Sequence, residues 1–217
     1  MIKKIVLLFG LLLLAGSLIG CDSAKLKQDF QRGYDKYNPN GDRGICLYLG
    51  RIKNYPYTTK YMEKEINDDI PFLSNIEFKE RLAGFAEIGM FTREKVSEDH
   101  GEDIYRYSLT DLGHQYLKPE GFCFGKIIVT GVKTSDTITD SIGRVMKTAQ
   151  LSTEIENIPD WVNDNLDKLS TTIGVNMHDI VPNGGTSILM TQTSKGWSKQ
   201  GQLGWIRYGY YLASPED

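Results

Sequence analysis

The chain has 217 residues and a net charge of −3 at neutral pH, with 40% hydrophobic and 11% aromatic residues. This composition excludes a disordered chain, and 22 glycines with only 7 prolines exclude a collagen-like or low-complexity one. The acidic balance argues against nucleic-acid binding, because phosphate binding needs clustered excess cations. The length allows one domain or two small ones.

The first 20 residues differ sharply from the rest. Lys3 and Lys4 form a short basic segment, and an uncharged apolar stretch follows from Ile5 to Ile19. This stretch is shorter than the roughly 20 residues that a transmembrane helix needs. A polar segment begins directly after Cys21, which favours a cleaved signal peptide over a membrane span.

The segment Leu18-Ile19-Gly20-Cys21 resembles the lipobox of bacterial lipoprotein signal peptides. The resemblance implies cleavage after Gly20, thioether lipidation of Cys21, and acylation of the new N-terminus by a fatty acid such as palmitate. Several acyl chains would anchor the protein stably to a bilayer. We therefore expect residues 1–20 to be a signal peptide. The mature 197 residues would carry 23 basic and 28 acidic side chains, a net charge of −5.

Lipidation implies a protein tethered to the cell membrane and facing the periplasm. Asp22 follows the lipidated cysteine and resembles an inner-membrane retention signal of enterobacteria; the outer membrane is the alternative where that rule does not apply. The expected partners are the bilayer, through acylated Cys21, and an envelope protein or small ligand, with no nucleic acid.

Lipidation of Cys21 leaves Cys46 and Cys123 as the other cysteines. The compartment outside the inner membrane is oxidising, which favours a disulfide between them. The bond would span 77 positions and contribute roughly 4 kcal/mol through loop entropy. The alternative is a pair of buried thiols that act as small hydrophobic side chains.

Residues 21–120 are predicted to form a helical, winged-helix-like region. Its order of helix, strand, turn, strand and short helix resembles half of a winged-helix unit. DNA binding is not expected, because residues 77–106 carry five basic against eight acidic side chains. In chain order we expect a helix over 24–38, a strand over 44–50, a helix from a capping box at Ser74 to Gly89, strands over 90–97 and 103–109, and a short helix from Thr110 to about 117.

Residues 121–217 are predicted to form a strand-rich region with one helix, packed on the first region as one compact unit. The chain as a whole is therefore predicted to be α+β. In chain order we expect an apolar strand over 122–132, a loop over 134–141, an alternating strand over 145–155, a helix opened by Pro159 and Asp160, a turn over 182–185, and strands over 186–193 and 203–212.

The sequence lacks the usual catalytic and cofactor-binding motifs. No Gly-x-Ser-x-Gly, Ser-x-x-Lys or phosphate-binding glycine loop occurs, which favours a non-catalytic protein without a cofactor. No two histidines have metal-ligand spacing, and ligands from distant segments cannot be recognised this way. His100 and His114 are expected at the surface. His178, beside Asp179, could be a base oriented by a carboxylate, but no nucleophile is located.

An aromatic segment near the C-terminus is a possible surface for a ligand or partner. In a strand, Trp205, Arg207 and Tyr211 would share one face, and Tyr208 and Tyr210 the other. Aromatic rings beside an arginine suit a binding platform. Cross-strand packing within the fold is the alternative.

Several short motifs occur in a familiar order: Ile45-Cys46-Leu47, Tyr107-Ser108-Leu109-Thr110, Phe122-Cys123-Phe124-Gly125-Lys126 and Pro159-Asp160-Trp161. Their order is similar to that of poorly characterised exported proteins described as carbapenem-tolerance (CpmK-type) proteins, over residues 45 to about 197. The resemblance implies structural cysteines and supplies no catalytic residues. Any antibiotic link would be sequestration or protection of a partner.

We therefore expect a membrane-anchored, non-catalytic interaction or binding protein of the bacterial envelope. One alternative is a small-molecule binding protein, with a cell-wall antibiotic as a possible ligand. Another is an unrecognised hydrolase that uses scattered polar residues.

Overall fold

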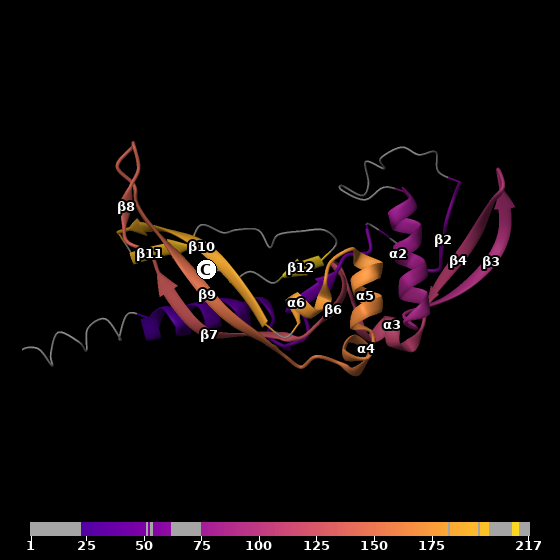
Figure 1. The fold of residues 1–217 in the computed structure, drawn as a ribbon, viewed down its shortest axis with the longest axis horizontal. Coiled ribbons are helices and arrows are strands. Elements are labelled where there is room, and N and C mark those ends of the chain that lie inside the picture. Colours follow the sequence, from indigo (N-terminus) through magenta and orange to yellow (C-terminus); the bar gives the residue numbers. More distant parts are fainter. Residues whose placement is uncertain are drawn as a thin grey trace, which may run out of the picture.

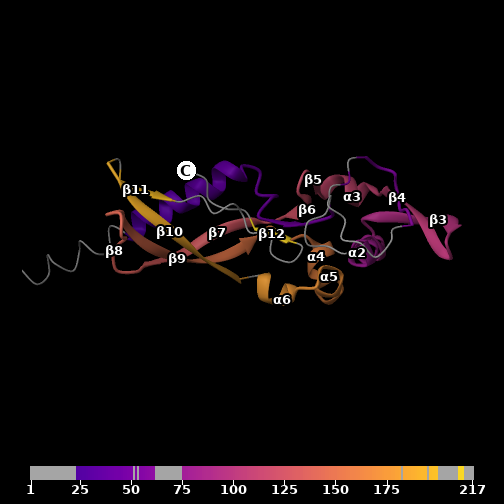
Figure 2. The ribbon, with the colours of Figure 1, turned by 90° about the horizontal axis from the view of Figure 1, so that it is seen from above.

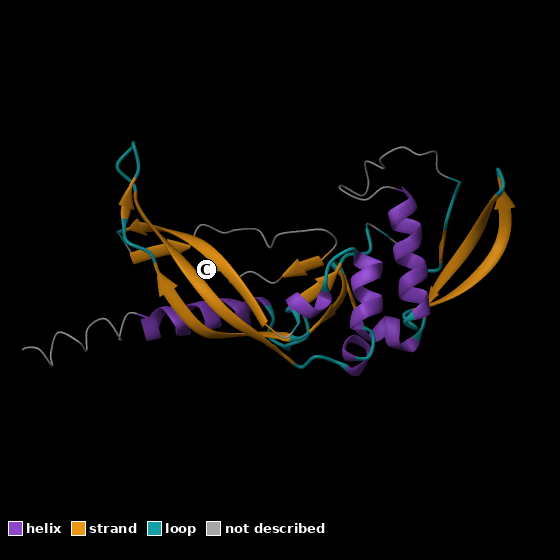
Figure 3. Cartoon of the chain, in the orientation of Figure 1, coloured by secondary structure: helices purple, strands orange, loops and turns teal. Residues whose placement is uncertain are grey.

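The computed structural model describes residues 23–50, 52, 54–61, 75–181, 183–194, 196–199 and 210–212. They form a mixed fold of helices and strands, as the sequence predicts (Figures 1 and 3). Within these ranges no helix is both long enough and apolar enough to cross a lipid bilayer. Residues 1–22, Ser74 and residues 201–209 lie outside the described part.

A twisted antiparallel sheet in the order β11-β10-β9-β7 forms one end of the molecule (Figure 1). Its strands are β7 (Lys126–Thr134), β9 (Val145–Glu156), β10 (Asn183–Thr193) and β11 (Gly196–Lys199), and the short β8 (Ile138–Thr139) pairs with β9. The predicted alternation in β9 is confirmed, since Leu151 and Ile155 are buried whereas Gln150, Ser152 and Glu154 are exposed.

The helix over residues 23–37 lies along one face of this sheet (Figures 1 and 2). Phe30 and Tyr34 are buried on the sheet-facing side. Gln31 joins the two elements, because its amide donates to the Ile127 carbonyl at 3.1 Å and accepts from the Val129 amide at 2.8 Å. The predicted amphipathic helix therefore covers the apolar face of strands that follow it by about a hundred residues.

A smaller sheet in the order β12-β1-β6-β5 lies at the centre. Its strands are β1 (Ile45–Leu47), β5 (Leu117–Lys118), β6 (Gly121–Phe124) and β12 (Tyr210–Leu212). All residues of β1 and β6 are buried. These strands fill the space between the two ends of the molecule.

The other end holds the predicted helix, hairpin and short helix in their predicted order. They are α2 (Asn75–Glu87), β3 (Phe91–Asp99), β4 (Glu102–Leu109) and α3 (Asp111–Tyr116), with β2 (Tyr57–Thr58) beside β4. The short helix begins at Thr110 as predicted, and the Thr110 hydroxyl caps it by accepting from the Gly113 amide. The resemblance to a winged helix stays a prediction.

A helix begins after Pro159 as predicted, but the prediction that it is a single continuous helix is wrong. The chain forms α4 (Asp160–Asn163), α5 (Leu166–Ile173) and α6 (Met177–Ile180). Asn165 explains the first break, because its side-chain amide donates to the Trp161 carbonyl at 2.9 Å. Asparagine side chains compete with the helical backbone for hydrogen bonds, and this local bond replaces the continuous ladder.

Two further expectations differ from the structure. The predicted turn over 182–185 is wrong for residues 183–185, which pair with β9, so tertiary pairing overrides the turn preference of Asn and Gly. The apolar run over 122–132 is divided between β6 and β7 at Gly125, whose φ is +75°. Its carbonyl accepts from the Gly44 amide at 2.8 Å and the Asn38 side chain at 3.0 Å.

Aromatic rings connect the central sheet to its neighbours. Phe122 of β6 packs against Phe85 of α2 at 5.1 Å between ring centroids and against Phe91 of β3 at 5.3 Å. Phe124 packs edge-on against Trp161 at 5.6 Å, so this buried tryptophan belongs to the core. Burial of one such phenylalanine contributes about 1.5–3 kcal/mol.

Gly125→Ala is expected to lower the free energy of unfolding by about 2–4 kcal/mol. A Cβ there would lie 2.7 Å from the Ile155 side chain, and the positive φ adds about 1–3 kcal/mol of backbone strain. Gly143→Ala is the matched control, because its φ is +81° but nothing lies within 4 Å. Urea denaturation measures both variants. Equal losses would show that the contact with Ile155 costs nothing.

Candidate functional site

A groove lies between α2 and α5 at the helical end. It has a volume of about 760 Å³. Its lining residues come from the two helices and the turn after α5: Glu77, Glu80, Arg81, Ala83, Gly84, Glu87, Asp167, Lys168, Thr171, Thr172, Ile173 and Gly174.

The groove is predominantly acidic. Four acidic and two basic side chains line it, which gives a net charge of −2. Lys168 forms an ion pair with Glu87 across the helices, and its hydrogen bond lowers the pKa of the Glu87 carboxyl. One of the two cations is therefore neutralised by a carboxylate of the opposite helix.

The second cation, Arg81, has a structural role. It is only 4% exposed, and its guanidinium donates to the Tyr48 carbonyl at 3.0 Å and the Ile173 carbonyl at 3.3 Å. Burial lowers its pKa to about 10, against the opposing effect of the Glu77 charge. Arg81 therefore stays protonated at neutral pH and ties α2 to the chain after β1 and to the end of α5.

Gly84 sets the separation of the two helices. A Cβ at this position would lie 2.3 Å from the Thr172 hydroxyl and 2.7 Å from its methyl group. Only the absence of a side chain lets α5 approach α2 this closely, and the groove depends on that approach. The sequence shows no signal for this pair, because it does not indicate which helices pack together.

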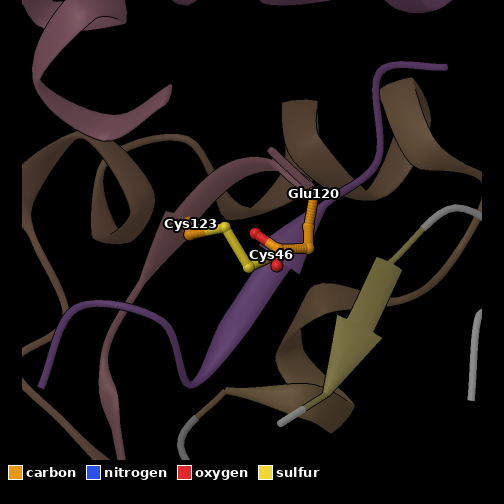
Figure 4. Close-up of side chains that lie close together, drawn as sticks. All are labelled: Cys46, Glu120 and Cys123. Carbon is orange, nitrogen blue, oxygen red and sulfur yellow. A yellow bond between two sulfur atoms is a disulfide. The ribbon is translucent and has the colours of Figure 1, made fainter. Parts of the chain in front are cut away.

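The predicted disulfide between Cys46 and Cys123 is present. The two residues lie directly opposite each other in the antiparallel pair of β1 and β6, with 3.9 Å between their Cα atoms. Both are fully buried. Glu120 extends toward the bond, and its carboxylate and the two sulfur atoms lie within 4.8 Å of one another (Figure 4).

The Glu120 carboxylate contacts one charged and one neutral side chain. Its Oε1 atom forms an ion pair with Arg43 and accepts from the Tyr37 hydroxyl at 3.5 Å. Lys118 and Asp42 form a second pair nearby in the chain, at 2.6 Å. The Oε2 atom of Glu120 is buried and has no hydrogen-bond partner among the described residues. The two sulfur atoms and the Glu120 carboxylate therefore form a second candidate site, apart from the groove.

The histidines lie at the surface. His100 and His114 are exposed, as predicted. His178 does contact a carboxylate, but the partner is Asp167 of α5, at 2.9 Å from Nε2, and not its neighbour Asp179. Both side chains are largely exposed, so the pair lies at the edge of the groove and not in an enclosed catalytic cleft.

Two predicted sites fall on residues that the structure does not describe. Cys21 precedes the described part, and Trp205, Arg207 and Tyr208 lie between its last segments. Only the backbone of Tyr210 and Tyr211 is described, in β12, where they pair with Leu47 and Cys46 of β1. The lipidation site and the aromatic platform stay predictions.

Comparisons of the chain with protein-family models, with curated proteins and with solved structures found no match in any of the three.

Gly84→Ala is expected to lower the free energy of unfolding by about 1–3 kcal/mol, since overpacking at the helix contact outweighs the better helix propensity of alanine. The double variant Gly84→Ala with Thr172→Ala should recover most of the loss, because it removes both atoms that clash. Thermal and urea unfolding measure this coupling. Additive losses in the double variant would contradict the close approach of α2 and α5.

Proposed function

We propose that the chain is a lipid-anchored, non-catalytic binding protein of the bacterial envelope, and that its groove between α2 and α5 binds a positively charged segment of a partner protein. The single observation that carries the second part is the charge of the groove. Its net charge is −2, and both of its cations already have structural contacts. Such a surface attracts cationic groups and repels anionic ones.

The form of the groove favours a protein segment over a small apolar compound. Small-molecule pockets are mostly apolar and enclose most of the ligand surface. This groove is open along two helices, and eight of its twelve lining residues carry a charge or a hydroxyl group. Ile76 on α2 is 55% exposed, so an apolar residue of the partner would also find a contact close to the acidic side chains.

The anchoring part of the proposal rests on the lipobox-like segment ending at Cys21. Exchange of Cys21 for serine is expected to prevent lipidation, so that the protein accumulates uncleaved or leaves the membrane fraction. Cell fractionation with labelling by a palmitate analogue measures this. Cys46→Ser is the matched control, because it also removes a cysteine but should keep the label. Normal fractionation and labelling of the Cys21→Ser protein would contradict the anchor.

The groove can be tested with a photo-crosslinking amino acid at Thr171, which is exposed in the groove. Thr130 on β7 is the matched control position, because it is an exposed threonine with the same hydroxyl-to-carbonyl hydrogen bond. We expect a discrete adduct from position 171 in intact envelopes and none of that mass from position 130.

Charge reversal then tests the electrostatic part. Glu80→Lys in the groove should reduce the adduct from position 171 several-fold, and added salt should do the same, since screening weakens surface charge attraction. Glu154→Lys on the exposed face of β9 is the control and should leave the adduct unchanged. An adduct yield that Glu80→Lys leaves unchanged would contradict recognition of a cationic segment in the groove. The result for the lipid anchor would not be affected.

A further inference from the structure

Three side chains capable of binding a metal ion meet in the central sheet. Cys46 comes from β1 and Cys123 from β6, and Glu120 lies in the turn between β5 and β6. Their ligand atoms lie within 4.8 Å of one another (Figure 4). Two sulfur atoms and one carboxylate oxygen form a ligand set that suits a thiophilic divalent cation such as Zn²⁺.

The sulfur atoms are available to a metal only when the disulfide is reduced. A dithiol reductant supplies two electrons and two protons, so the Cys46–Cys123 bond breaks, two thiols form, and the reductant becomes a disulfide. Metal binding then displaces the thiol protons, because the thiolate is the ligand form of cysteine.

The charge balance of the reduced site favours a cation. Two thiolates beside the Glu120 carboxylate would place three negative charges within a few ångströms, and Arg43 offsets only one of them. A divalent ion offsets the other two. The buried Oε2 atom of Glu120 has no hydrogen-bond partner among the described residues, so it would give up no hydrogen bond on binding the ion.

We propose that the reduced protein binds one thiophilic divalent metal ion through Cys46, Cys123 and Glu120, so that the disulfide and the metal site are alternative states of the same residues. The geometry permits both states. Tetrahedral Zn²⁺ with Zn–S bonds of about 2.3 Å holds two sulfurs about 3.8 Å apart. Residues with 3.9 Å between their Cα atoms reach that separation by side-chain rotation alone.

Glu120 lies on the side of the site that is nearer to solvent. Its side chain is 28% exposed, although its Oε2 atom is buried, and both cysteines are fully buried. With three protein ligands, the fourth tetrahedral position would hold a water molecule on that side.

The test uses the purified full protein, oxidised or reduced with a trialkylphosphine, which takes up the oxygen of one water molecule as the disulfide becomes two thiols. Zn²⁺ is titrated by calorimetry, and Co²⁺ serves as the spectroscopic probe. The reduced protein should bind one equivalent of Zn²⁺, and the Co²⁺ form should show thiolate charge-transfer bands and the intense visible bands of tetrahedral cobalt. The oxidised protein should show neither.

Glu120→Gln keeps the size of the side chain but removes the anionic ligand. It should weaken Zn²⁺ binding by the reduced protein at least about tenfold. Glu154→Gln on β9 is the matched control and should bind like the unaltered protein. Absence of binding by the reduced protein, equal binding by the oxidised form, or equal affinities of the two variants would each overturn the proposal. The last result would show that the cysteines bind the ion without Glu120.

Discussion

The antiparallel pair of β1 and β6, closed by the Cys46–Cys123 bond, joins the two ends of the molecule. Each strand has only a few residues, and a pair this short would be marginal by itself. The disulfide prevents the two strands from separating. On β6, Phe122 packs against Phe85 of α2, and Phe124 packs against Trp161. The helical end and the sheet end both depend on these few buried residues.

The chain crosses this centre several times, so neither end is one continuous segment. The helix over residues 23–37 packs on β7, which follows β6 in the chain. Helix α5 packs against α2, although α2 lies between β1 and β6 in the chain and α5 follows both strands. Gly125 makes one of these crossings possible, because its left-handed backbone conformation lets the chain change direction between β6 and β7. Its carbonyl accepts hydrogen bonds from Asn38 and Gly44. Arg81 secures another by holding the end of α5 to α2.

The sequence predicts the local elements well where a local cause exists. The alternation of β9, the apolar spacing of the helix over 23–37 and the Thr110 cap each act within a few residues, and the structure contains all three. The disulfide was predictable because so few cysteines were left to pair. The breaks at Asn165 and Gly125 depend on hydrogen bonds that form only in the folded chain. The hydrophobic pattern continues across both positions, so the sequence predicts one helix and one strand there.

The candidate sites were harder to predict for the same reason. The groove exists because Gly84 lies against Thr172, and the ligand set exists because the turn at Glu120 lies over the bond between β1 and β6. Each combines segments far apart in the chain. The two sites also differ in exposure: charged side chains line the open groove, whereas both cysteines are fully buried.

Hydrogen exchange of the native protein tests the central role of the β1–β6 pair most directly. Amides of α2 at one end and of β9 at the other should exchange with one common free energy of opening, which falls equally at both ends when the disulfide is reduced. Two distinct free energies, of which only one responds to reduction, would contradict the account, because the ends would then unfold as independent units.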